Sequence, residues 1–114
     1  MTAFRALLII MILVVLSYTG IVVATHGFGF IPVFFGDIKA MGWSGQFNLD
    51  FSGLLVLAGL WMGWRHQFSP AGLALGLFVL VGGTPLLATY LLWASLKANG
   101  NVNVLLLGHQ RAAA

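Results

Sequence analysis

The chain has 114 residues, of which 61% are hydrophobic and only 6% are charged, and its mean hydropathy is +1.04. This composition excludes an ordinary soluble domain, because a chain of this length cannot bury so much apolar surface. The net charge of +3 comes from cations scattered singly along the chain, which argues against nucleic-acid binding, and the lack of cysteine excludes disulfides and thiolate metal sites.

The first apolar run extends from Ala6 to Ala24 and carries no charge. It is longer than the hydrophobic region of a secretory signal, so we expect a retained helix that crosses the membrane at about residues 6–25. The next segment, residues 26–46, is rich in glycine and aromatic residues. It is broken too often for a crossing helix and is too apolar for a solvated loop, so we expect it at the membrane interface or dipping in against protein, with a short helix near Val33–Met41.

The second apolar run predicts a crossing helix at about residues 47–64. Its strictly uncharged part, Phe51–Trp64, is short, so the polar first turn with Asn48 and Asp50 must help to cross the hydrocarbon core. The loop that follows is also short, which makes the second and third helices antiparallel neighbours.

The third run, from Ala71 to Leu96, predicts a crossing helix at about residues 71–96, with Ser69 as its N-cap and Pro70 as its first residue. Pro85 lies near the middle of this run, where it removes a backbone hydrogen bond and predicts a kink. The tail, residues 97–114, opens with a helix stop. Its apolar stretch, Val102–Leu107, is too short to span a membrane and can lie on the surface or contact a partner.

These segments predict an all-α integral membrane protein of one domain: a bundle of three transmembrane helices with an interfacial segment between the first and the second. We expect a multi-pass protein of the inner or plasma membrane. In this topology Arg5 and Arg65 share one side, and Lys39, Lys97 and Arg111 share the other. The charge balance is nearly even, and the leading Arg5 favours an N-terminus inside the cell.

An up-down-up path gathers the polar groups of the spans in one half of the bilayer. The predicted intramembrane polar cluster consists of Asp50, Asn48, Tyr18, Tyr90 and His26. An acidic side chain at the centre of a membrane helix raises the free energy of insertion by roughly 2.5 to 3.5 kcal/mol, so Asp50 is expected to have a structural or functional role. It either caps its helix near headgroup water, or is a protonatable or cation-binding carboxylate against Tyr18 and Tyr90, or contacts a partner subunit or bound ligand.

Small residues recur at helical spacing in the second and third runs. Gly59 and Gly63 form one Gly-x-x-x-Gly pair, and Gly72 and Gly76 form another. Such pairs let helices approach closely in lipid. They predict packing of these two helices against each other or a seam for another subunit.

Catalytic motifs and metal-ligand patterns are missing from the sequence. His26 and His66 fall at opposite membrane faces, so they cannot clamp one haem within a single chain. A lone intramembrane carboxylate without a paired base or metal ligand is a poor basis for an enzyme. We therefore predict no enzymatic activity, no metal site and no intrinsic cofactor, and leave open a lipid, pigment or haem shared at a subunit interface.

Four short motifs occur in a characteristic order: Phe30-Ile31-Pro32-Val33-Phe34-Phe35, Asn48-Leu49-Asp50-Phe51, Trp64-Arg65-His66 and Gly83-Thr84-Pro85-Leu86. In this order they resemble a family of small bacterial and cyanobacterial membrane proteins, domain of unknown function 2834. The resemblance covers most of residues 5–97 and implies three spans and an acidic residue at the position of Asp50, but no activity. Small multidrug exporters are similar in length but have four spans and a glutamate in the first, a pattern this chain lacks.

Two functions follow as hypotheses. The first is a small accessory subunit of a larger membrane complex of respiratory, photosynthetic or oxygenase type, which would stabilise neighbouring subunits, lipids or pigments. The alternative is a homo-oligomeric transporter or proton or cation conductor centred on Asp50, in which the segment Gly82–Pro85 acts like the interrupted helices of transporters. We predict the lipid bilayer and other membrane protein subunits as partners, with copies of the same chain in the alternative, and no nucleic acid.

Overall fold

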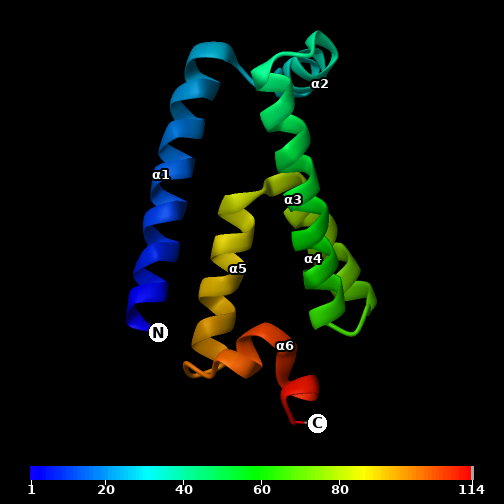
Figure 1. The fold of residues 1–114 in the computed structure, drawn as a ribbon. Coiled ribbons are helices and arrows are strands. Elements are labelled where there is room, and N and C mark those ends of the chain that lie inside the picture. Colours follow the sequence, from blue (N-terminus) through cyan, green and yellow to red (C-terminus); the bar gives the residue numbers. More distant parts are fainter. Residues whose placement is uncertain (114) are drawn as a thin grey trace.

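The computed structural model describes residues 1–113, and this part of the chain is built from helices joined by short turns, with no strand (Figure 1). The helices are α1 (Thr2–His26), α2 (Phe30–Ala40), α3 (Trp43–Arg65), α4 (Pro70–Gly82), α5 (Thr84–Lys97) and α6 (Val102–Ala113). The predicted all-α fold class is confirmed.

Two of the helices, α1 and α3, are long and apolar enough to cross a membrane. At ~1.5 Å per residue they are about 37 and 34 Å long, which exceeds the ~30 Å thickness of the hydrocarbon core. α3 begins at Trp43, earlier than the predicted start at about residue 47. The polar turn that contains Asn48 and Asp50 therefore lies inside this helix rather than at its first residues.

The short helix predicted in the segment 26–46 is α2, which packs against the first turns of α3. The turn between them is tight, because a Cβ atom placed on Gly45 would lie only 2.2 Å from the carbonyl oxygen of Asp37. Asn48 Nδ2 also donates a hydrogen bond to the Phe34 carbonyl oxygen at 3.1 Å. These contacts fix α2 across the start of α3.

The third predicted span is not confirmed as one helix, because the segment 71–96 is divided between α4 and α5. Gly83 separates them with φ 66° and ψ −142°, a conformation that glycine adopts easily and that ends a helix. Pro85 lies in the first turn of α5 instead of at a kink within one helix, where its missing N–H costs no hydrogen bond. Each half is only about 20 Å long at ~1.5 Å per residue, too short to cross the hydrocarbon core.

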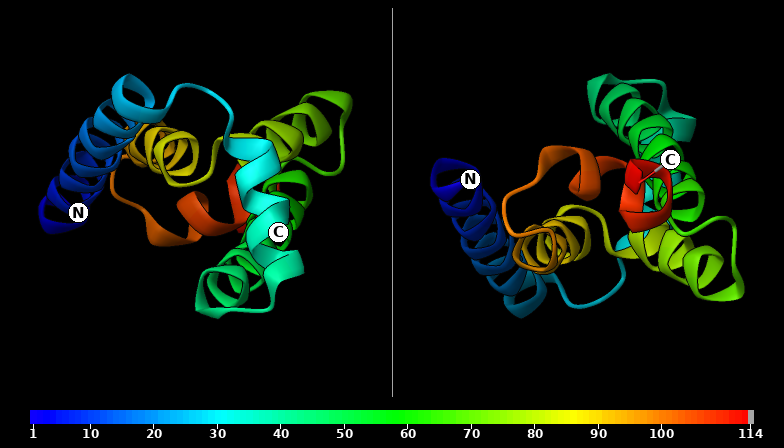
Figure 2. Two further views of the ribbon diagram at one scale, coloured as in Figure 1. Left: turned by 90° about the horizontal axis from the view of Figure 1, so that it is seen from above. Right: turned by 90° about the horizontal axis from the view of Figure 1, so that it is seen from below.

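The chain reverses at Gly83, so α4 and α5 form a hairpin that returns to the end from which it started (Figure 1). Gly83 is buried beside Phe51 and Leu55, part of the way up α3. At the other end of α5, Arg5 near the start of α1 donates hydrogen bonds to the hydroxyl and carbonyl oxygens of Ser95, at 3.1 and 3.0 Å. In both views along the long axis of the molecule, α5 lies between α1 and the α3–α4 pair (Figure 2).

The closest helix pair is α3 and α4, which are antiparallel as the short loop predicts. Ser69 caps α4 by accepting a hydrogen bond from the Gly72 N–H at 3.2 Å, as expected from the sequence. Further along, the backbones nearly touch: a Cβ on Gly59 would lie 3.0 Å from the Gly76 carbonyl oxygen, and one on Gly76 would lie 2.8 Å from that of Gly59.

The tail after Lys97 is also ordered into a helix, α6, which bends at Gly108 (φ 82°). Its apolar stretch contacts the rest of the chain, because Leu105 is buried and packs with Ala94 and Ala98. Gly108 lies against the backbone of Arg65, with a Cβ position only 2.9 Å from the carbonyl oxygen. α6 therefore closes the end of the molecule where both chain ends lie (Figure 1).

The reversal at Gly83 sorts the charged residues into two groups. One group, Arg5, Arg65, Lys97 and Arg111, lies at the end closed by α6, which we call the basic end. The opposite end, formed by α2 and the turns on either side of it, contains Asp37 and Lys39, and we call it the α2 end.

Candidate functional site

Arg65 is the most extensively hydrogen-bonded side chain of the basic end. It is the last residue of α3 and is only 9% exposed. Its guanidinium donates to the carbonyl oxygens of Leu105 at 2.7 Å and Val104 at 3.2 Å, and to the Tyr90 hydroxyl at 2.7 Å. One side chain thus joins the end of α3 to both α5 and α6 through charge-assisted hydrogen bonds.

Tyr90 connects Arg65 to His66. Its hydroxyl oxygen accepts from Arg65 and also forms a hydrogen bond with His66 Nε2, and the two rings meet edge to face with centroids 5.7 Å apart. A neutral His66 satisfies this arrangement, because its Nε2 accepts the Tyr90 proton. Burial, and secondly the positive charge of Arg65, lower the pKa of His66 below its ordinary value of 6.5, so this imidazole is neutral near pH 7.

Other donors hold the same end together. Trp61 Nε1 donates to the Leu106 carbonyl oxygen at 3.0 Å. The Arg111 guanidinium donates to the Trp64 carbonyl oxygen and lies 4.0 Å from the centre of the Trp64 ring, a cation–π contact. These contacts place α6 firmly against the end of α3.

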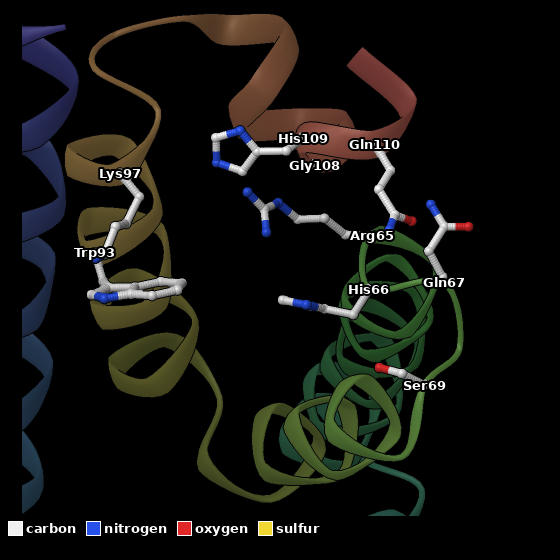
Figure 3. A pocket seen from close by; sticks show the side chains of 9 residues that line it. All are labelled: Arg65, His66, Gln67, Ser69, Trp93, Lys97, Gly108, His109 and Gln110. Atoms are coloured by element: carbon white, nitrogen blue, oxygen red, sulfur yellow. The ribbon is translucent and has the colours of Figure 1, made fainter. Parts of the chain in front are cut away.

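A cavity of about 580 Å³ opens between these elements. Its lining residues come from α3, the loop after it, α5 and α6: Arg65, His66, Gln67, Ser69, Trp93, Lys97, Gly108, His109 and Gln110. Figure 3 shows the Arg65 and His66 side chains extending from the end of α3 toward Trp93 and Lys97 of α5, with His109 of α6 beside them. We call this the basic cavity.

The basic cavity combines positive charge with hydrogen-bond donors. Arg65 and Lys97 are cations, and Lys97 Nζ lies 5.9 Å from the centre of the Trp93 ring. The two acidic side chains of the chain, Asp37 and Asp50, are on α2 and in the first half of α3, far along the molecule from this site. Chemically, such a cavity suits an oxygen-rich anion better than a cation.

The residues of the predicted polar cluster lie in different places. Tyr90 belongs to the basic end, while Tyr18 is 72% exposed on the outside of α1. Asp50 is exposed on α3. Only His26 and Asn48 share a cavity, of about 600 Å³ at the α2 end. The structure thus brings together two of the five residues.

The four glycines of the predicted seam all lie at the contact between α3 and α4. Gly59 and Gly76 face each other as described above. Gly72 lies against the turn after α3, with a Cβ position 2.6 Å from His66 Cβ and 3.3 Å from the Gly63 carbonyl oxygen. Gly63, Gly72 and Gly76 are buried within the chain itself.

Sequence reasoning treated Arg65 only as a loop charge and missed its place in a site. The signal was present in the segment Gly82-Gly83-Thr84-Pro85, which matches a helix end followed by proline in the first turn of a new helix. Interpreted in that way, the segment predicts that the chain reverses at Gly83. The residues of α5 then lie at the same end of the molecule as Arg65 and His66: Tyr90, Trp93 and Lys97.

Comparisons of the chain with protein families, with curated proteins and with solved structures gave no match. The resemblance to domain of unknown function 2834 therefore stays a prediction. Within residues 1–113 no group of three or more histidine, cysteine, aspartate or glutamate residues is placed to hold a metal ion.

Proposed function

We propose that this protein is an integral membrane protein of the cell membrane that acts as a non-catalytic accessory subunit of a larger membrane assembly. Its chain would cross the membrane with α1 and α3, and the α4–α5 hairpin would enter the bilayer and return. The proposal starts from a single observation, which is the exposure of apolar surface along the two long helices, a surface that lipid or neighbouring subunits must cover.

That exposure is extensive. Only 6% of the most hydropathic window of α1 and 11% of that of α3 is buried within the chain. Large side chains such as Leu13 (61% exposed) and Leu57 (64% exposed) project from these helices. In water this surface would cause aggregation, whereas lipid tails or apolar faces of other subunits would cover it at no cost.

The α4–α5 hairpin is compatible with a re-entrant position. Non-helical backbone is tolerated at membrane depth only where it is covered by protein. Gly83, the residue of reversal, is buried against Phe51 and Leu55 of α3, and its N–H is bonded to the Val79 carbonyl oxygen at 2.9 Å. These contacts support a hairpin whose tip stays inside the bilayer.

The sorting of charges supports an orientation. Arg5, Arg65, Lys97 and Arg111 share the basic end, whereas the α2 end carries Lys39 alone among lysines and arginines. Positive residues near membrane spans are retained on the cytoplasmic side. We therefore place the basic end, with both chain ends, in the cytoplasm.

One observation keeps the transporter alternative as a second candidate. The break at Gly83 lies against Phe51, the neighbour of Asp50, and interrupted helices near the bilayer midplane bind ions in transporters. The change Asp50→Asn tests it in proteoliposomes, with Asp37→Asn as the control. A transporter would lose cation flux only in the first variant, whereas an accessory subunit would show no flux in any form.

The proposed function is tested by extraction in a mild detergent, followed by native gel electrophoresis, mass spectrometry of comigrating proteins and an absorption spectrum of the same band. Comigration with a larger membrane complex is the expected result. A band that contains only this chain, unchanged by gentler detergents or chemical crosslinking in the membrane, would contradict the accessory role.

A further inference from the structure

A second cavity adjoins the basic cavity and has a different character. Its volume is about 450 Å³, and it shares His66 and Trp93 with the basic cavity. It lies between α3, α4 and α5 and is lined almost entirely by apolar side chains: Met62, His66, Leu75, Phe78, Val79, Leu86, Thr89, Tyr90 and Trp93. We call it the apolar cleft. We call these two adjoining cavities together the recess, with the basic cavity as its cationic part and the apolar cleft as its apolar part.

Among residues 1–113, which the structure describes, no acidic side chain lies beside the buried charge of Arg65 in the cationic part. Arg65 uses three of its five N–H groups on two carbonyl oxygens and a phenol, all of which are neutral acceptors. The aspartates lie elsewhere, as described above, and Lys97 adds a second cation to the same cavity. A buried charge is costly unless a counter-charge is near, so an anion in the basic cavity would stabilise the folded chain.

We propose that this recess binds one anionic phospholipid, with the phosphate in the basic cavity beside Arg65 and Lys97 and part of an acyl chain in the apolar cleft. The inference rests on the membrane position given by the proposed function. It adds a specific lipid site, formed by the hairpin and by α6.

The position of the recess favours a lipid over a free phosphate ion. A free ion would fill only the basic cavity, whereas the apolar cleft beside it matches a hydrocarbon chain. The recess also lies at the end where cations collect and where Trp61, Trp64 and Trp93 cluster, as aromatic residues do at headgroup level. Anionic lipids are concentrated in the cytoplasmic leaflet that this end would face.

The test uses the purified full chain in a neutral detergent. Phosphatidylglycerol, phosphatidylcholine with the same acyl chains, and inorganic phosphate are each titrated, and binding is followed by tryptophan fluorescence and by the midpoint of thermal unfolding. We expect saturable binding and a raised midpoint with phosphatidylglycerol, and a much smaller effect with the other two compounds.

Two variants locate the site. Lys97→Gln removes an exposed cation of the basic cavity and should weaken phosphatidylglycerol binding about fivefold, the effect of ~1 kcal/mol per cation at an anionic surface. Lys39→Gln, the matched control at the α2 end, should leave the affinity unchanged. Thr89→Phe fills the apolar cleft from an exposed helix position and should weaken binding of the lipid without changing the response to inorganic phosphate.

Three results would overturn the inference: equal affinity for both phospholipids, inorganic phosphate binding as tightly as phosphatidylglycerol, or equal effects of the two lysine changes. Fractionation of cells separates this failure from that of the proposed function. A chain that sediments with membranes but lacks lipid selectivity contradicts only the lipid site, whereas a chain found outside the membrane fraction contradicts the proposed function itself.

Discussion

The two ends of the molecule are held together by different kinds of contact. At the basic end, four side chains each donate a hydrogen bond to the backbone of a helix far away in the sequence: Arg5, Trp61, Arg65 and Arg111. At the α2 end, α2 and α3 are joined by a tight turn and by the hydrogen bond from Asn48, between residues close in sequence. Long side chains, most of them cationic, therefore determine the tertiary arrangement of the basic end, whereas local turns suffice at the α2 end.

The largest expected effect is on the side of the membrane from which the two ends of the α4–α5 hairpin can be labelled. Each position is labelled either from one side or from the other, so the result is all-or-none. The chain has no cysteine, so single cysteines can be introduced at Ser69, Lys97 and Gly29 and labelled with an impermeant thiol reagent in oriented vesicles. The hairpin predicts that positions 69 and 97 are labelled from the same side, and position 29 from the other. Labelling of positions 69 and 97 from opposite sides would mean that residues 71–96 cross the membrane as a third span. The four cations would then not share one end of the molecule.

The next effect is the loss of the Arg65 anchor. Arg65→Ala removes three hydrogen bonds and leaves the carbonyl oxygens of Val104 and Leu105 without their donor. We expect a loss of about 3 kcal/mol in the free energy of unfolding, measured by thermal or denaturant unfolding in detergent, and faster proteolysis at Asn99–Asn101 as α6 detaches.

Lys39→Ala is the control for the Arg65 change, because it removes an exposed cation at the α2 end. Its expected effect on stability is within about 0.5 kcal/mol. Equal effects of the two changes would mean that the basic end is no more dependent on its cations than the α2 end.

A smaller effect is expected at the contact that joins α4 to α3. Gly76→Ala places a methyl group 2.8 Å from the Gly59 carbonyl oxygen, so the two helices must move apart, and we expect a loss of about 1 to 2 kcal/mol. Gly53→Ala is the matched control on α3, where a Cβ would have no neighbour within 4 Å. Unfolding midpoints of both variants in one detergent give the comparison, and an unaffected Gly76 variant would show that the close contact is dispensable.

Much of the α2 end and of the two long helices could be predicted from the sequence. Apolar run length indicated α1 and α3, and Ser69-Pro70 marked the start of α4. The frequent breaks in residues 26–46 excluded a crossing helix there, and the short helix predicted near Val33–Met41 is α2, which begins earlier, at Phe30. These features depend on local propensity and hydropathy, which a single sequence displays directly.

The basic end could not be predicted in the same way. An apolar run of the length of residues 71–96 has the same composition whether it crosses the bilayer or reverses within it, and here the positive φ of Gly83 decides between the two. The contact of Arg65 with Tyr90 and Leu105 depends on that reversal, which the sequence marks only by the short segment Gly82-Gly83-Thr84-Pro85. The apolar stretch of the tail was predicted to lie on the surface or to contact a partner, whereas its Leu105 is buried within the chain itself and anchors α6.

The smallest predicted effect is a pH dependence confined to the basic end. The pKa of His66 is lowered in the folded chain, so between that lowered value and 6.5 the unfolded chain binds more protons than the folded chain, and stability decreases as the pH falls through this range. A protonated His66 would also lose its ability to accept from Tyr90 and would face Arg65 and Lys97 across the basic cavity.

Unfolding midpoints recorded from about pH 8 to about pH 5 should fall in the native chain, and less so in His66→Gln, whose amide oxygen can still accept a hydrogen bond. His26→Gln at the α2 end and His109→Gln in the same cavity serve as controls. If the pH dependence of the unfolding midpoint disappears with His109→Gln but persists with His66→Gln, His109 and not His66 is responsible, which contradicts the prediction. If it disappears with His26→Gln, the pH dependence arises at the α2 end.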